Sequence, residues 1–181
     1  LAAAVFYLAH GTFATAALFL VALRVSAVRG ETGDALVAGP ACRGRLALPA
    51  AYLLAAVAVA GLPPLGGFLA KLAILDAAIG AEGAAWTFTA VLTASLFAIV
   101  ALARAGSTVF WKVGQERGEV VEVSRWRPLA AAGLGVLAAA IVGLALQAGT
   151  AFDFADRTAG QLLDREGYIR AVLGEREGGG D

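Results

Sequence analysis

The sequence predicts an all-α, polytopic membrane protein with about four transmembrane helices, one of them broken at residues 61–67, plus a C-terminal amphipathic helix. Three observations lead to this fold class. Hydrophobic residues make up 60% of the 181 residues and charged residues 15%, whereas soluble domains are about half apolar and about a quarter charged. The charges cluster between long apolar runs, and one apolar run is interrupted by "GLPPLGG".

Three apolar runs are long enough to cross a bilayer, which takes roughly 20 residues for a core about 30 Å thick. Residues 1–23 carry no charge and predict the first span. Residues 86–111 predict another span, with Trp86 and Trp111 as interfacial anchors at its ends. Residues 128–147 are uncharged and predict the last span.

Residues 46–80 do not fit one regular span. A straight helix over them would be about 52 Å long at about 1.5 Å per residue, and two separate spans would each be barely long enough. A single span broken in mid-membrane places the loops 24–45 and 112–127, with their eight basic residues, on one side, and Glu82 opposite. That asymmetry follows the positive-inside bias, so we expect the two basic loops to face the cytoplasm.

The break at residues 61–67 has a chemical basis. Pro63 and Pro64 lack the N–H that a helix uses, and Gly61, Gly66 and Gly67 permit backbone angles that other residues avoid. The break therefore frees polar backbone groups at membrane depth, where protein or a water-filled cavity must satisfy them. Broken helices of this kind hold ion sites in secondary transporters. A proline kink with only a packing role is the alternative.

Lys71 follows Pro64 by seven residues, about two helical turns into the second half of the span. An amine at this depth does not reach the interface easily, and burial in lipid disfavours a charged group. An amine that changes between neutral and charged forms can relay a proton. Asp76, five residues later, is a candidate outlet carboxylate or a solvated residue at the helix end.

His10 is the single histidine and lies near the middle of the first span. Its ordinary pKa of about 6.5 suits proton exchange near neutral pH, and a structural hydrogen bond to another helix is the alternative. Arg104 lies two turns before the end of its span. It can extend towards the basic side of the membrane or take part in an ion pathway.

Composition and motifs exclude several classes of function. The formal net charge is zero, which argues against nucleic-acid binding. The sequence shows no catalytic triad, metal-ligand cluster or phosphate-binding loop, so we expect no metal, no cofactor and no enzymatic activity. The chain contains no methionine and begins with an apolar run, from which we expect the C-terminal part of a longer protein.

Residues 1–148 are expected to form the membrane domain and residues 149–181 an interfacial tail. The tail has apolar residues at helical spacing, which is typical of an amphipathic helix. They are Ala155, Ala159, Leu162, Ile169 and Leu173.

The segments "HGTFATAALFL", "GLPPLGGFLAKLAIL" and "ALARAGSTVFW" resemble the last third of the antiporter-like membrane subunits. This family is shared by respiratory complex I and the Mrp-type multisubunit cation/proton antiporters. "RAGSTVFW" and "GYIRAVLG" are most similar to the D subunit of the Mrp type. The resemblance covers nearly the whole chain, and the proline-glycine motif with its lysine is its most specific part.

The resemblance implies about fourteen helices in two inverted repeats, each with a broken helix that carries a lysine or glutamate. Lys71 matches the lysine of the second repeat, and His10 matches the histidine of the preceding helix. Two positions depart from the family pattern. Ala14 replaces a lysine found in several complex I relatives, and "PPLGGF" replaces the usual "PPLSGF".

The resemblance also implies a function. We expect a subunit of a multisubunit Na+(K+)/H+ antiporter in a bacterial cell membrane, without cofactor. Its expected partners are the other subunits, the lipid bilayer, protons and Na+ or K+. A proton-pumping subunit of a NADH-quinone oxidoreductase or related hydrogenase complex is one alternative, and a non-conducting membrane scaffold is another.

Overall fold

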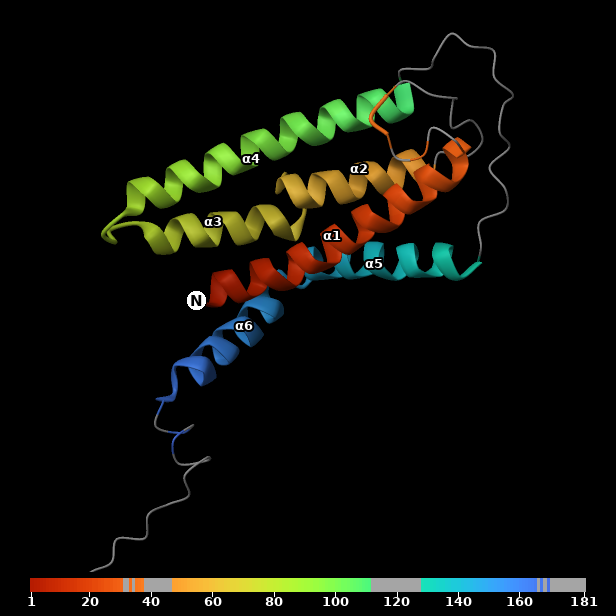
Figure 1. The fold of residues 1–181 in the computed structure, drawn as a ribbon. Helices are drawn as coiled ribbons and strands as arrows, with labels where there is room; N and C mark the ends of the chain where they lie inside the picture. The colour runs from red at the N-terminus through yellow and green to blue at the C-terminus, as the bar shows by residue number, and fades with distance from the viewer. Residues whose placement is uncertain are drawn as a thin grey trace, which may run out of the picture.

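The computed structural model describes residues 1–30, 33, 35–37, 47–111, 128–165, 167 and 169 (Figure 1). Within these residues the elements are helices, which confirms the predicted all-α class. In chain order they are α1 (Ala2–Arg29), α2 (Ala47–Ala60), α3 (Gly66–Ala78), α4 (Ala84–Gly106), the π-helical turn η2 (Ser107–Trp111), α5 (Pro128–Leu146) and α6 (Ala148–Leu163).

Three of these helices are long and apolar enough to cross a membrane: α1, α4 continued by η2, and α5, with 28, 28 and 19 residues. Even the shortest is about 28 Å long at about 1.5 Å per residue, close to the thickness of a bilayer core. Trp86 and Trp111 lie exposed at the two ends of the α4 span, as predicted. The first span extends beyond the predicted residue 23, to Arg29.

Helices α2 and α3 have 14 and 13 residues. Each is about 20 Å long, too short to cross a bilayer alone. Figure 1 shows them following one another in nearly the same direction beside α4, so together they form one discontinuous helix.

The break in this helix covers residues 61–65, two residues fewer than the predicted 61–67. Gly66 and Gly67 form the first turn of α3, where backbone N–H groups have no carbonyl partner within their own helix. Close packing explains why glycines begin the helix here. A Cβ atom at Gly67 would lie 2.5 Å from the carbonyl oxygen of Ala58 in α2.

The ends of the helices support a single broken span. The last residues of α1, the first of α2, the end of η2 and the start of α5 lie at one end of the bundle, on the right in Figure 1. The turn between α3 and α4, which contains Glu82, lies at the other end. Most of loop 24–45 beyond α1 and all of loop 112–127 lie outside the described residues, and their cytoplasmic location stays a prediction.

Helix α1 is the centre of the bundle and packs against α2, α3, α5 and α6. Much of the core is built from alanines, which allow helix backbones to approach closely in a membrane. The principal core cluster consists of Ala14, Ala17, Val21, Val25, Leu48, Ala55, Ala58, Leu65, Leu134 and Ile141.

Helix α6 is the described part of the predicted amphipathic tail. Its buried residues Ala155 and Ala159 are those predicted, and the ring of Phe152 stacks on Phe6 of α1 with centroids 4.3 Å apart. Leu162 and Ile169, the other described residues of the predicted stripe, are exposed, and their place at the interface stays a prediction. Leu173 lies outside the described residues.

Candidate functional site

Two of the backbone groups that the break leaves at helix ends are the carbonyl of Ala60 in α2 and the N–H of Gly67 in α3. Such terminal groups have no partner within their own helix. The Lys71 Nζ donates to the Ala60 oxygen at 2.7 Å, and the Gly67 N–H donates to His10 Nε2 at 3.1 Å. The two residues predicted as proton carriers therefore meet at the break, one from α3 and one from α1.

Lys71 joins three helical segments. Its Nζ also donates to Ser95 Oγ of α4 at 2.9 Å, while the Ser95 hydroxyl donates to the carbonyl of Val91 at 2.7 Å. Gly61 makes room for the amine, because a Cβ atom there would lie 2.7 Å from Nζ. Its φ of +71° also lies in the left-handed region that favours glycine.

His10 is buried, with 1% of its surface exposed, and its ring lies against the first turn of α3. Cβ atoms at Gly66 and Gly67 would lie 3.0 Å and 2.9 Å from its ring carbons Cδ2 and Cε1. Because a backbone N–H can donate only to an unprotonated ring nitrogen, this geometry requires a neutral imidazole with its proton on Nδ1.

The side chain of Lys71 borders a cavity of about 370 Å³, which we call the Lys71 cavity. Small side chains on α4 leave this space, and it has room for several water molecules. Its lining residues are Tyr7, Val59, Lys71, Ile74, Ala90, Val91, Ala94, Ser95 and Ala98.

Asp76 and Arg104 are not part of this cluster. Both side chains are exposed, on α3 and α4, and neither has a hydrogen bond or ion pair within the part of the chain that the structure describes. Arg104 is nine residues from Ser95, about 13 Å along α4 at about 1.5 Å per residue. Within the same described residues, no three His, Cys, Asp or Glu side chains form a group that could hold a metal ion.

Ser95 is a site residue that the sequence analysis missed. It is one of several hydroxyl residues in α4, together with Thr87, Thr89 and Thr93. Its position near the middle of the span was a usable signal, since a polar group at that depth needs a partner. The partner itself, 24 residues away in the sequence, depends on helix packing.

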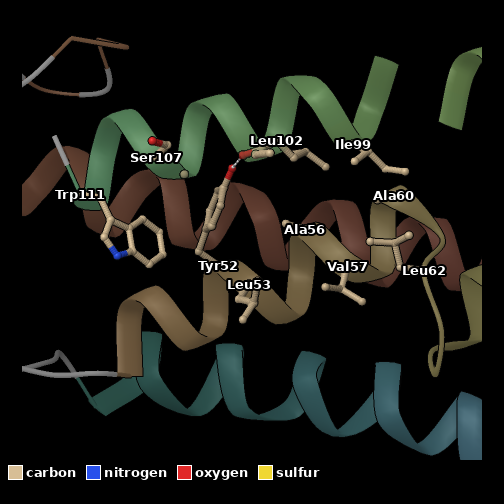
Figure 2. A pocket seen from close by; sticks show the side chains of 12 residues that line it. Tyr52, Leu53, Ala56, Val57, Ala60, Leu62, Ile99, Leu102, Ser107 and Trp111 are labelled. Atoms are coloured by element: carbon tan, nitrogen blue, oxygen red, sulfur yellow. Dashed lines mark hydrogen bonds between the residues drawn. The ribbon is translucent and has the colours of Figure 1, made fainter. Parts of the chain in front are cut away.

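Tyr52, in α2, forms a second contact between α2 and α4. Its hydroxyl donates to the carbonyl of Leu102 at 2.6 Å (Figure 2), and a Cβ atom at Gly106 would lie 2.6 Å from its ring. The ring borders an apolar cavity of about 170 Å³ that extends from Ala60 and Leu62 to Trp111. This contact fixes the two helices whose polar groups hold Lys71.

Known proteins resemble this chain over the part that includes the helix break. A family model described as NADH:quinone oxidoreductase/Mrp antiporter, TM, matches residues 1–98, which include every residue bonded at the break. A protein of Rhizobium meliloti, named as the probable D subunit of a K(+)/H(+) antiporter, is 31% identical, over 96% of this chain and 36% of the relative. The D subunit of the Na(+)/H(+) antiporter of Bacillus subtilis is also 31% identical, over 95% of this chain and 34% of the relative.

A third relative, the D subunit of the Na(+)/H(+) antiporter of Alkalihalophilus pseudofirmus, is 29% identical over 97% of this chain and 35% of the relative. The chain thus spans about one third of the length of these relatives. No solved structure matches it.

The family model covers more than half of the chain, including α1, α2 and α3. The apolar helices and this match together make the chain a multi-pass membrane protein, and they confirm the resemblance found in its motifs. The chain therefore belongs to the NADH:quinone oxidoreductase/Mrp antiporter transmembrane family.

Proposed function

We propose that this chain is part of a subunit of a multisubunit Na+(K+)/H+ antiporter and that it carries protons by way of Lys71 and His10. The observation that carries the proposal is the pairing of both side chains with backbone groups at the helix break. The names of the three relatives favour antiport. The proposal extends the activity in these names to a chain that spans about a third of the relatives' length.

Lys71 has the hydrogen-bonding chemistry of a proton carrier. A charged amine has three N–H donors, and two of them are matched by the Ala60 carbonyl and the Ser95 hydroxyl. The Ala60 carbonyl lies at the partially negative end of α2, a good partner for a cation. A neutral amine can keep one of these bonds and accept from a water molecule in the Lys71 cavity.

His10 links proton binding to the geometry of the break. Nε2 accepts from the Gly67 N–H, so a proton that arrives at Nε2 turns an acceptor into a donor and breaks this bond. The imidazole would then have to move away from the first turn of α3. Protonation of His10 and the position of α3 are therefore coupled in this proposal.

Asp76 and Arg104 are proposed as the outer members of the pathway. Asp76 lies on α3 towards the Glu82 end of the bundle, and Arg104 lies on α4 towards the opposite end. They thus lie on opposite sides of Lys71 along the span. The exposed carboxylate of Asp76 can exchange protons and attract cations near one membrane surface, whereas the guanidinium of Arg104 stays charged and would influence ions near the other surface only through its positive charge.

The remaining parts of the proposal concern the setting of the chain. Residues 1–148 would form the C-terminal part of the proton-translocating membrane domain, and residues 149–181 an amphipathic tail at the interface. The proposed partners are the other antiporter subunits, the lipid bilayer of the bacterial cell membrane, protons and Na+ or K+. No nucleic acid, cofactor or enzymatic reaction is part of the proposal.

A second candidate is a proton-pumping subunit of a NADH-quinone oxidoreductase or related complex. The family description, which names both classes, favours it. A non-conducting scaffold is the third candidate, in which Lys71 and His10 would do no more than satisfy the broken helix.

The test uses Lys71→Ala in the complete antiporter complex, with the exposed neighbour Leu72→Ala as matched control. Everted vesicles with a pH-sensitive dye receive Na+ or K+. We expect Lys71→Ala to assemble and to lose cation-driven proton movement, because the variant lacks the titrating amine without gaining a buried charge. Leu72→Ala should exchange normally.

Near wild-type exchange by an assembled Lys71→Ala complex would leave Lys71 a packing residue and favour the scaffold. Proton uptake that requires NADH and a quinone in wild-type vesicles, with no response to cations, would favour the redox-driven pump. Cation-dependent exchange without NADH supports the antiporter.

A further inference from the structure

Two cavities adjoin at the side chains of Tyr7 and Ile74. One is the Lys71 cavity, and the other is a hollow of about 890 Å³ along α1, which we call the α1 groove. The α1 groove is lined by Ala4, Tyr7, Leu8, Gly11, Thr12, Thr15, Ala16, Phe19 and Ile74. Since Tyr7 and Ile74 line both spaces, they form the partition between them.

Tyr7 is the polar member of this partition. Its phenol can donate and accept a hydrogen bond at the same time, whereas Ile74 can do neither. Polar groups lie on both sides of it, with Lys71 and Ser95 in one cavity and Thr12 and Thr15 in the other. An apolar partition would interrupt a chain of hydrogen-bonded water molecules between the two spaces. The phenol hydroxyl of Tyr7 would continue that chain.

We propose that Tyr7 is a proton-relay residue between the Lys71 cavity and the α1 groove, an inference that rests on the proposed role of Lys71. A water molecule in the Lys71 cavity takes a proton from the ammonium and passes it to the phenol oxygen. The original O–H proton leaves at the same time to a water molecule in the α1 groove. One proton enters and one leaves, and rotation of the O–H bond restores the starting state.

Ile74 makes this route depend on the hydroxyl. It lies one turn beyond Lys71 on α3, is half-buried, and borders both spaces as Tyr7 does. Shortening Ile74 would widen the partition and let water molecules pass it. Water molecules could then take the place of the phenol, so exchange in a variant with a shortened Ile74 should depend less on the Tyr7 hydroxyl.

The test compares Tyr7→Phe with Thr158→Val in the complete complex. Each variant loses one hydroxyl, but Thr158 donates an exposed hydrogen bond to the Phe154 carbonyl of its own helix, α6, and lines neither of the two cavities. Positioned proton-transfer groups contribute about 10²–10⁴-fold, and bridging water softens their loss, so we expect Tyr7→Phe to slow exchange at least about tenfold. The solvent isotope effect, the ratio of the exchange rates in H₂O and D₂O, should rise for Tyr7→Phe because proton transfer becomes rate-limiting. Thr158→Val should change neither quantity per assembled complex.

The double variant Tyr7→Phe with Ile74→Ala should regain exchange, which a loss of packing alone would not do. The proposal is overturned if Tyr7→Phe exchanges within about twofold of wild type with an unchanged isotope effect while Lys71→Ala is inactive. If Lys71→Ala remains active as well, the proposed function fails, and the two failures are thereby distinguished. Rates are normalised to assembled complex, so lower expression of a variant does not mask the result.

Discussion

Gly67→Ala is expected to damage the break without altering any titratable group. The added Cβ would lie 2.5 Å from the Ala58 carbonyl oxygen and 2.9 Å from His10 Cε1. Both distances are far below ordinary van der Waals contact, and one of the atoms is backbone, which cannot rotate away. The first turn of α3 must therefore move away from α2 and from His10.

The magnitude follows from two effects. Overpacking a well-packed site costs about 1–3 kcal/mol, and weakening the hydrogen bond from the Gly67 N–H to His10 Nε2 costs about 0.5–1.5 kcal/mol. Alanine gains about 1 kcal/mol in helix propensity over glycine, which offsets part of this loss. We expect a net loss of about 1–3 kcal/mol.

The assay measures thermal unfolding of the complex in detergent together with cation-driven exchange in vesicles. Gly143→Ala in α5 is the matched control, because a Cβ atom there meets nothing within 4 Å. The control should be neutral or slightly stabilising, and Gly67→Ala should unfold at lower temperature and exchange more slowly. Equal stability and exchange for the two variants would refute the close packing at the break.

Two further predictions concern the site and the topology. Ser95→Ala should slow exchange and lower the stability of the complex, since a hydrogen bond to a charged group contributes about 1.5–3 kcal/mol. A rate unchanged from wild type would mean that Ser95 does not hold the amine in the working protein. In a Cys42→Ser background, Leu36→Cys and Lys112→Cys should be labelled from the cytoplasmic side and Glu82→Cys from the other. Labelling of the first two from opposite sides would contradict the broken span.

The spans and the break could be predicted because their signals are local in the sequence. Apolar length, interfacial tryptophans and the prolines of "GLPPLGG" each act on the chain where they occur. The end of the break was predicted two residues too late, because a glycine favours both a break and the close packing of a helix start. Gly67 serves the second purpose, through its contact with Ala58 in α2.

The partners in the site could not be predicted in the same way. Lys71 and His10 stood out because polar groups are costly at membrane depth. Their contacts with Ala60, Ser95 and Gly67 depend on how the helices rotate about their axes and pack. For Asp76 and Arg104 the sequence left an exposed position and a place in the pathway both open, and the structure places both side chains at the surface.

The bond between Lys71 and Ala60 has a mechanical consequence. The amine belongs to α3, but the carbonyl it bonds belongs to α2, so the bond bridges the hinge formed by residues 61–65. Helix α3 is a rigid arm about 20 Å long, so a rotation of about 10° at the hinge would move its far end by about 3.5 Å. The same rotation would stretch the bond between the amine and α2. In the proposed mechanism, a charged Lys71 amine strengthens this bond between α3 and α2, and a movement of α3 that stretches the bond makes the proton easier to remove.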